Sequence, residues 1–217
     1  MTASDQLRFQ DRTDAGCQLA RALEHYRDQD ALVLAIPRGG VEIGYRVARH
    51  LRADLSIIIT RKLPLPDNPE AGFGAVAEDG SLYLDQESAG WLPRSTVQRI
   101  IRDQEEEIRR RISALRQGRP LPLIAGRPVI LVDDGIAMGS TMRVSISLCR
   151  HQKAGRIVAA SPVSGASTAQ EFEGLVDEMI VLTTPHFFRA VAQVYEHWYD
   201  VSDEEVIAIL KKWHQEG

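Results

Sequence analysis

The sequence of 217 residues lacks the features that mark several special classes of protein. Cysteine occurs twice, at Cys17 and Cys149, and neither has a Cys or His at metal-ligand spacing, so both are most simply reduced core thiols. No apolar run approaches membrane-spanning length, and the early charges, among them Asp5 and Arg12, do not fit a signal peptide. We therefore expect a cytoplasmic protein with no membrane partner.

An excess of basic charge is also missing. The chain has 26 Lys and Arg against 30 Asp and Glu, a formal net charge of −4, so we expect no nucleic-acid partner. Hydrophobic residues (44%) and charged residues (26%) have ordinary shares. The length fits one α/β domain with an accessory piece, or two small domains, and we favour one domain over residues 1–217.

The most informative stretch runs from Val129 to Thr141. Its first four residues are apolar and read as a buried strand, Asp133 and Asp134 follow, and a small-residue turn leads into a helix. In open α/β sheets, ligands bind beyond the carboxyl ends of strands, and a helix N-terminus favours an anion. The stretch predicts a site with hydroxyls or a metal on one side and a phosphate on the other.

This stretch allows two other interpretations. A Walker-type phosphate loop needs Lys where Ser140 stands, so a nucleoside triphosphate site is disfavoured. Alternatively, the aspartates only cap the next helix. Two adjacent acids make that awkward, because they repel unless a cation or ligand hydroxyls share them.

Two earlier strands also end in polar turns. An amphipathic helix over residues 13–28 precedes an apolar strand over 31–36, which leads into Pro37-Arg38-Gly39-Gly40 and a helix over about 41–51. Glycines let the backbone approach a ligand, and an arginine pairs with phosphate oxygens. A further strand over 55–60 ends at Arg61-Lys62, which alternatively form only a solvated strand terminus.

After Lys62 we expect a long irregular loop, rich in proline and glycine, that ends in a hairpin around Asp79-Gly80. A helix over 93–117 carries an apolar stripe that packs on this chain's own core or, in a homodimer, on a second subunit. Strands over 157–162 and 179–183 follow, and a capping box of Ser202 and Glu205 starts the last helix.

The sequence resembles type I phosphoribosyltransferases. Three motifs and their order along the chain support this resemblance: the Arg38-Gly39-Gly40 loop, the Arg61-Lys62 pair, and the strand and turn that contain Asp133 and Asp134. The layout is similar to a bacterial subgroup whose acceptors are undefined. The resemblance implies an open, mainly parallel five-stranded sheet with helices on both faces. It also implies a core over about 30–183 with the inserted helix at 93–117, a mobile lid loop over about 61–81, and a hood from about 1–28 and 184–217.

The resemblance also implies a site for phosphoribosyl pyrophosphate (PRPP). Asp133 and Asp134 would hold the ribose hydroxyls and Mg²⁺, directly or through water, and act in catalysis with Arg61 and Lys62. The groups implied for the phosphates are Ala137, Met138, Gly139, Ser140 and Thr141 for the 5′-phosphate, and Arg38, Gly39, Gly40, Arg61 and Lys62 for pyrophosphate. For the acceptor pocket it implies Phe187 or Phe188, with Tyr195, Trp198 and Tyr199 as alternatives; these aromatics can equally be core or interface residues.

The implied activity is Mg²⁺-dependent transfer of the phosphoribosyl group of PRPP to a nitrogenous base, with release of pyrophosphate. Met138 stands where the family usually has threonine, so we expect weaker phosphate binding. Ala137 replaces the aspartate usual in enzymes for 6-oxopurines, which argues against hypoxanthine and guanine. Glu70 and Glu78 are weak candidates for an acid or base. The alternatives are a PRPP- or nucleotide-binding regulator, and a hydrolase or phosphorylase of a phosphorylated sugar or nucleotide.

Overall fold

A parallel five-stranded sheet forms the centre of the computed structural model, which describes residues 8–216 apart from the side chain of Glu70. The strands lie in the order β2-β1-β6-β7-β8, and every neighbouring pair is parallel. Their bounds are β2 Asp54–Ile57, β1 Leu32–Ala35, β6 Pro128–Val132, β7 Arg156–Val163 and β8 Glu178–Thr183. The predicted fold class is therefore confirmed.

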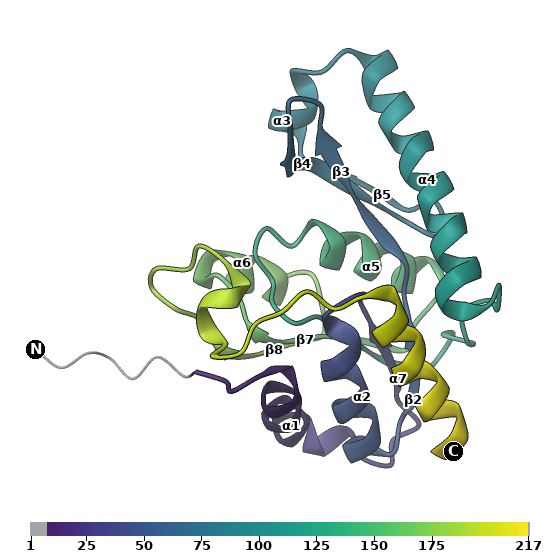
Figure 1. Cartoon of the computed structure of the whole chain (residues 1–217), viewed down its shortest axis with the longest axis vertical. Coiled ribbons are helices and arrows are strands. Elements are labelled where there is room, and N and C mark those ends of the chain that lie inside the picture. The colour runs from purple at the N-terminus through teal and green to yellow at the C-terminus, as the bar shows by residue number, and fades with distance from the viewer. Residues whose placement is uncertain (1–7, 217) are drawn as a thin grey trace, which may run out of the picture.

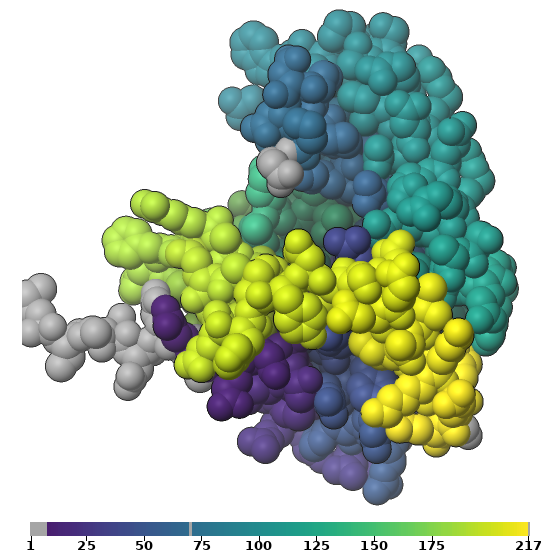
Figure 2. Space-filling model, in the orientation of Figure 1, coloured from purple at the N-terminus to yellow at the C-terminus, as the bar shows by residue number. Residues whose placement is uncertain are grey.

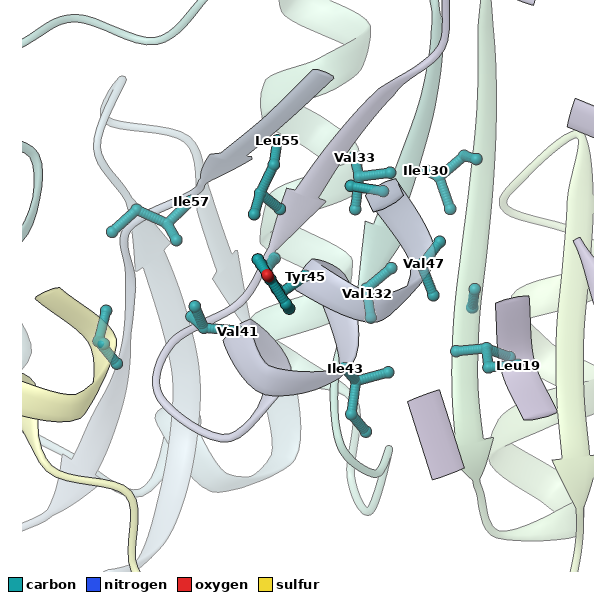
Figure 3. Packing of buried hydrophobic residues seen from close by; sticks show 14 of the residues in the cluster. Leu19, Val33, Val41, Ile43, Tyr45, Val47, Leu55, Ile57, Ile130 and Val132 are labelled. Atoms are coloured by element: carbon teal, nitrogen blue, oxygen red, sulfur yellow. The ribbon is translucent and has the colours of Figure 1, made fainter. Parts of the chain in front are cut away.

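Helices cover both faces of the sheet (Figure 1). Helices α1 (Arg12–Ala22) and α2 (Gly40–Leu51) lie on one face, and α5 (Ser140–His151) and α6 (Ala166–Glu173) lie on the other. Alternate residues of β6 enter two separate cores: Ile130 and Val132 pack with α1 and α2, and Val129 and Leu131 pack with α5. Figure 3 shows the first of these cores, with Leu19 and Ile43 beside the strands. Burial on both faces explains why the strands are apolar throughout.

Residues 60–116 form an arm that stands away from the sheet (Figure 1). It contains an antiparallel sheet in the order β3-β4-β5 and two helices. Their bounds are β3 Thr60–Leu65, β4 Asn68–Ala77, β5 Leu82–Leu84, α3 Gln86–Gly90 and α4 Arg94–Arg116. The predicted helix over 93–117 is thus present as α4. Its apolar stripe packs on this chain's own core through Ile100, Ile108 and Leu115.

The expectation of an irregular loop over about 61–81 is wrong, because most of that segment lies in β3 and β4. Buried Leu63, Phe73 and Ala75 give these strands their packing. Three of the residues that indicated a loop, Pro64, Gly72 and Gly74, lie where the strand pairing shifts register on both sides of Pro64. The expected hairpin around Asp79-Gly80 is present between β4 and β5.

The start of the described chain pairs with the segment that follows β8. Phe9 donates its N–H to the carbonyl of Val194 in the short helix η2 (Val191–Val194), and Glu196 donates its N–H to the carbonyl of Phe9. The short helix η1 (Glu24–Tyr26) lies between α1 and the first strand of the sheet. At the other end of the chain, α7 (Asp203–Glu216) packs on α2 and α4. The hood over 1–28 and 184–217 stays a prediction, and its first seven residues lie outside the described part.

Two further expectations concern thiols and membranes. Cys149 is buried as expected, but Cys17 is exposed, because it lies on the outer side of α1. Among residues 8–216, no helix has the length and apolar character needed to cross a bilayer.

Candidate functional site

Asp133 and Asp134 directly follow β6, the middle strand of the sheet. Asp133 lines a cavity of about 250 Å³. The other lining residues are Lys62, Gly72, Gly135, Ile136, Ala137, Met138, Gly139, Ser140, Thr141 and Met142. The structure therefore gathers one carboxylate, one lysine and the whole predicted phosphate turn around one space. In Figure 2 the molecule is hollowed between the arm and the C-terminal segment.

The phosphate turn is held from the side by α6. The hydroxyl of Thr168 donates to the carbonyl of Ala137 (2.9 Å), and the ring of Phe172 lies against Gly139. Gly139 has a φ of 74°, in the left-handed region that favours glycine, and the next residue begins α5. The turn therefore ends at a helix N-terminus, where free N–H groups favour an anion. Met138 is 70% exposed on this turn.

The loop after β1 approaches the same carboxylates from the neighbouring strand. It contains a cis peptide bond between Pro37 and Arg38 and leads into α2. A β-carbon added at Gly40 would lie 2.7 Å from the carbonyl oxygen of Val132, and one at Gly39 would lie 1.8 Å from Oδ2 of Asp134. The Arg38 side chain is 41% exposed, with Nη1 3.9 Å from Oδ1 of Asp203 at the start of α7.

Arg61 and Lys62 point to different surroundings because neighbouring strand residues face opposite sides. Lys62 lines the cavity with Asp133. Arg61 donates from Nε to Oε1 of Gln104 on α4 (3.0 Å), and its burial lowers the pKa of its guanidinium. The structure therefore brings Lys62, and not Arg61, to the cavity among the described residues.

Arg12 is a site residue that sequence reasoning missed. Its side chain is 3% exposed, and its Nε donates to Oδ2 of Asp134 at 2.8 Å. The guanidinium also lies 4.0 Å from the ring centroid of Trp198 and donates to the carbonyl of Tyr199. An arginine near the start of a chain gives no local signal for this role, because its partners come from distant segments.

The environment of the two carboxylates favours their neutral forms. Burial raises the pKa of Asp133 well above its usual value, and the neighbouring charge of Asp134 raises it further. Burial also raises the pKa of Asp134, and Arg12 opposes that shift. Such a pair is stabilised by a cation. In the described chain no three His, Cys, Asp or Glu residues form a metal cluster, so a Mg²⁺ here would need further oxygen ligands from a substrate or water.

The aromatic candidates for an acceptor pocket separate. Phe187 is 82% exposed on the loop after β8, whereas Phe188 packs against the core and Gly165. Tyr195 donates its hydroxyl to the backbone carbonyl of Asp134 (2.7 Å). Trp198 and Tyr199 have their rings beside Arg12. The structure thus brings Tyr195 to Asp134, and Trp198 and Tyr199 to Arg12, the partner of Asp134.

Glu78 is not at the cavity. Its carboxylate accepts a hydrogen bond from the N–H of Ile59 (2.9 Å) and pairs with buried Arg116. This ion pair joins the end of α4 to the residue after β4 at the base of the arm. Glu78 is therefore engaged in a structural contact, and the hypothesis that it acts as an acid or base is wrong. The side chain of Glu70 lies outside the described part of the chain. A larger cavity of about 320 Å³ lies between β2, α7 and the end of α4, away from the carboxylates.

Comparison with known proteins gives the class. The phosphoribosyl transferase domain family matches residues 14–196, so the chain belongs to that family. This match confirms the resemblance to phosphoribosyltransferases that the sequence motifs indicated. The chain is 37% identical over 210 residues to a Mycobacterium tuberculosis H37Rv protein named "Putative phosphoribosyl transferase Rv0571c". The match covers 96% of this chain and 47% of that protein, so the chain spans about half the length of the curated relatives it matches.

A solved structure agrees with the same fold. The crystal structure of TT1426 from Thermus thermophilus superposes with a TM-score of 0.81 at 36% sequence identity. The match covers 95% of this chain and 99% of that one. The arm and the sheet are therefore shared with a relative over nearly the full chain.

Proposed function

We propose that the chain is a Mg²⁺-dependent phosphoribosyltransferase that uses PRPP and a small nitrogenous base. One observation carries this proposal: two glycine-containing turns, each leading into a helix N-terminus, flank one pair of carboxylates. Each turn suits one anionic end of PRPP, and the carboxylates between them suit the ribose hydroxyls and a cation. Family membership supports the same chemistry.

In the proposed reaction, the bond between the anomeric carbon and pyrophosphate breaks and a bond from that carbon to an acceptor nitrogen forms. Pyrophosphate leaves with the electron pair, and the acceptor nitrogen loses its proton. Residues 137–141 hold the 5′-phosphate, while Gly39, Gly40 and Lys62 hold the pyrophosphate and stabilise its growing charge. Arg38 and Arg61 reach the pyrophosphate only after their side chains move from Asp203 and Gln104.

Asp133 and Asp134 are the residues that would hold Mg²⁺, directly or through PRPP hydroxyls and water. The ion, when bound, neutralises the charge of pyrophosphate as it departs. Their carboxylates orient the ribose while positive charge develops at the anomeric carbon. The arm carries Lys62 and acts as the lid that keeps water from the reacting carbon.

Ala137 offers no carboxylate for a purine N7 proton, so hypoxanthine and guanine are disfavoured. Phe187, which is 82% exposed on the loop after β8, is the aromatic residue proposed to stack on the base. A PRPP-binding regulator is the second candidate, and it is favoured by Met138, which supplies no hydroxyl to the phosphate.

Calorimetric titration of PRPP with Mg²⁺ into the wild type and Asp133→Asn tests the proposal. We expect the wild type to bind PRPP and the variant to bind it at least about thirtyfold more weakly. Asp103→Asn, a change of an exposed carboxylate on α4 outside the site, serves as the matched control. Pyrophosphate release with a panel of bases then separates the transferase from the regulator. A folded wild type that binds no PRPP would contradict the proposal.

A further inference from the structure

The two aspartates after β6 lie in different surroundings. Asp133 lines the cavity with Lys62 and the phosphate turn. Asp134 is 15% exposed, and Arg12 occupies its Oδ2 at 2.8 Å. Within the described part of the chain, Asp134 does not contribute to the cavity wall. Gly39 also closes the space beyond Oδ2 of Asp134, because a β-carbon added at Gly39 would lie only 1.8 Å from that oxygen.

Arg12 is held by contacts with residues 198–199 and with Glu42 of α2. Its Nη1 donates to the carbonyl of Tyr199 (2.9 Å) and lies 3.8 Å from Oε2 of Glu42. The ring of Trp198 lies over its guanidinium, an arrangement that stabilises a cation. The hydroxyl of Tyr199 in turn donates to Glu42. These contacts hold one rotamer of a long side chain and so hold Asp134 as well.

We propose a division of roles between the two aspartates. Asp133 is the carboxylate that contacts the ribose and its cation, and Asp134 forms an internal pair with Arg12. Arg12 is then a positioning residue: it neutralises Asp134 and anchors the segment containing Trp198 and Tyr199 beside the PRPP site. This inference rests on the proposed function and refines it, because one of the two acids no longer touches the ligand.

The division has an electrostatic reason. Two adjacent buried carboxylates with no cation beside them would repel the polyanion PRPP. With Arg12 paired to Asp134, the entering ligand meets one uncompensated carboxylate. Removal of Arg12 alone leaves a buried charge unpaired, whereas removal of both charges leaves a neutral pair of similar size.

Five variants test the inference by calorimetry with PRPP and Mg²⁺, alongside chemical denaturation. We expect Asp133→Asn to weaken binding at least about thirtyfold and Arg12→Met about tenfold. The double variant Arg12→Met, Asp134→Asn should recover part of the affinity that Arg12→Met loses, because no buried carboxylate is left unpaired. Asp134→Asn alone completes the double-mutant cycle and should be less stable than the double variant. Arg21→Met, an exposed arginine of the same helix, is the matched control.

The outcomes are distinguishable. A double variant that binds as weakly as Asp133→Asn would overturn the division, since Asp134 would then contact the ligand. An Arg12→Met protein that loses stability but keeps wild-type affinity when folded would show that Arg12 is merely structural, which also overturns it. A folded wild type that binds no PRPP would overturn the proposed function, and the ligand role of Asp133 with it.

Discussion

A β-carbon added at Gly39 would lie 1.8 Å from Oδ2 of Asp134 and 2.8 Å from Nε of Arg12. Gly39 belongs to the loop after β1, and Asp134 follows β6, the strand paired with β1. The φ of Gly39 is −60°, which any residue adopts, so its backbone torsion does not require glycine. Glycine is required there because the two loops touch.

Gly39→Ala should therefore damage the site. We expect at least tenfold weaker binding of PRPP, because the methyl group must displace Asp134 or Arg12. Overpacking should also lower the free energy of unfolding by about 1–3 kcal/mol. Calorimetry and urea denaturation measure the two effects. Gly90→Ala is the control, since a β-carbon at Gly90 meets no atom within 4 Å, and wild-type affinity in Gly39→Ala would contradict the prediction.

Lys62 and Arg61 should respond differently to removal of their charge. Lys62 lines the cavity with Asp133, so Lys62→Met should weaken PRPP binding about tenfold or more. Arg61 donates to Gln104 on α4, so Arg61→Met should change the dissociation constant less than about threefold. Titration of both variants under the same Mg²⁺ concentration makes the comparison. Equal losses in the two would mean that Arg61 turns into the site when PRPP binds.

Met138→Thr should strengthen phosphate binding. Met138 is 70% exposed, so its replacement leaves no cavity in the core, and a threonine hydroxyl adds a donor at the phosphate turn. A hydrogen bond contributes about 0.5–1.5 kcal/mol net, so we expect about threefold to tenfold tighter PRPP binding. Met138→Val, which has the shape of threonine without its hydroxyl, is the control. Equal affinities of the two variants would show that the hydroxyl makes no contact.

The sequence signals that worked here are local ones. The four apolar residues before Asp133, and the spacing of Ile101, Ile108 and Leu115, predicted β6 and α4 correctly because burial sets their period. The glycine-containing turns were found from the strands that precede them. The family match confirms the general assignment of the chain.

The signals that failed depend on tertiary contacts. The arm strands were missed because Pro64, Gly72 and Gly74 normally mark loops, yet here they lie at shifts of strand register or close to a neighbouring strand. Arg12 was missed because Asp134 is 122 positions away in the chain, and no local pattern connects them. Alternation along β3 would have separated Lys62 from Arg61 had the segment been recognised as a strand.

Ser202→Ala should loosen the start of α7. Glu205 donates its N–H to Oγ of Ser202 (3.2 Å), and Ser202 donates its N–H to Oε2 of Glu205 (2.7 Å), which makes a complete capping box. Loss of such a cap costs about 1 kcal/mol of unfolding free energy. Urea denaturation measures it, with Ser95→Ala, an exposed serine inside α4, as the control. Equal losses in the two variants would mean that the box contributes nothing.

Glu107→Gln should make the protein less sensitive to acid. Arg110 donates to both carboxylate oxygens of Glu107 at 2.7 Å and Arg111 donates at 3.0 Å, and they lower the pKa of Glu107 from 4.5 to about 2. Because the folded pKa lies below the unfolded one, the stabilisation is present above about pH 4.5 and is lost as the pH falls toward 2. The carboxylate is 25% exposed, so solvent screening limits the effect to about 1 kcal/mol at pH 7.

Urea denaturation of the wild type and Glu107→Gln at pH 7 and pH 3 checks this prediction. The difference between the two proteins should shrink by more than half over that range, since at pH 3 Glu107 is protonated in the unfolded state while it is still largely ionised in the folded one. Glu106→Gln, an exposed neighbour on α4, controls for the general effect of removing a negative charge. A difference that stays constant from pH 7 to pH 3 would mean that the pairing contributes through packing of the side chains, because only a charge interaction follows protonation.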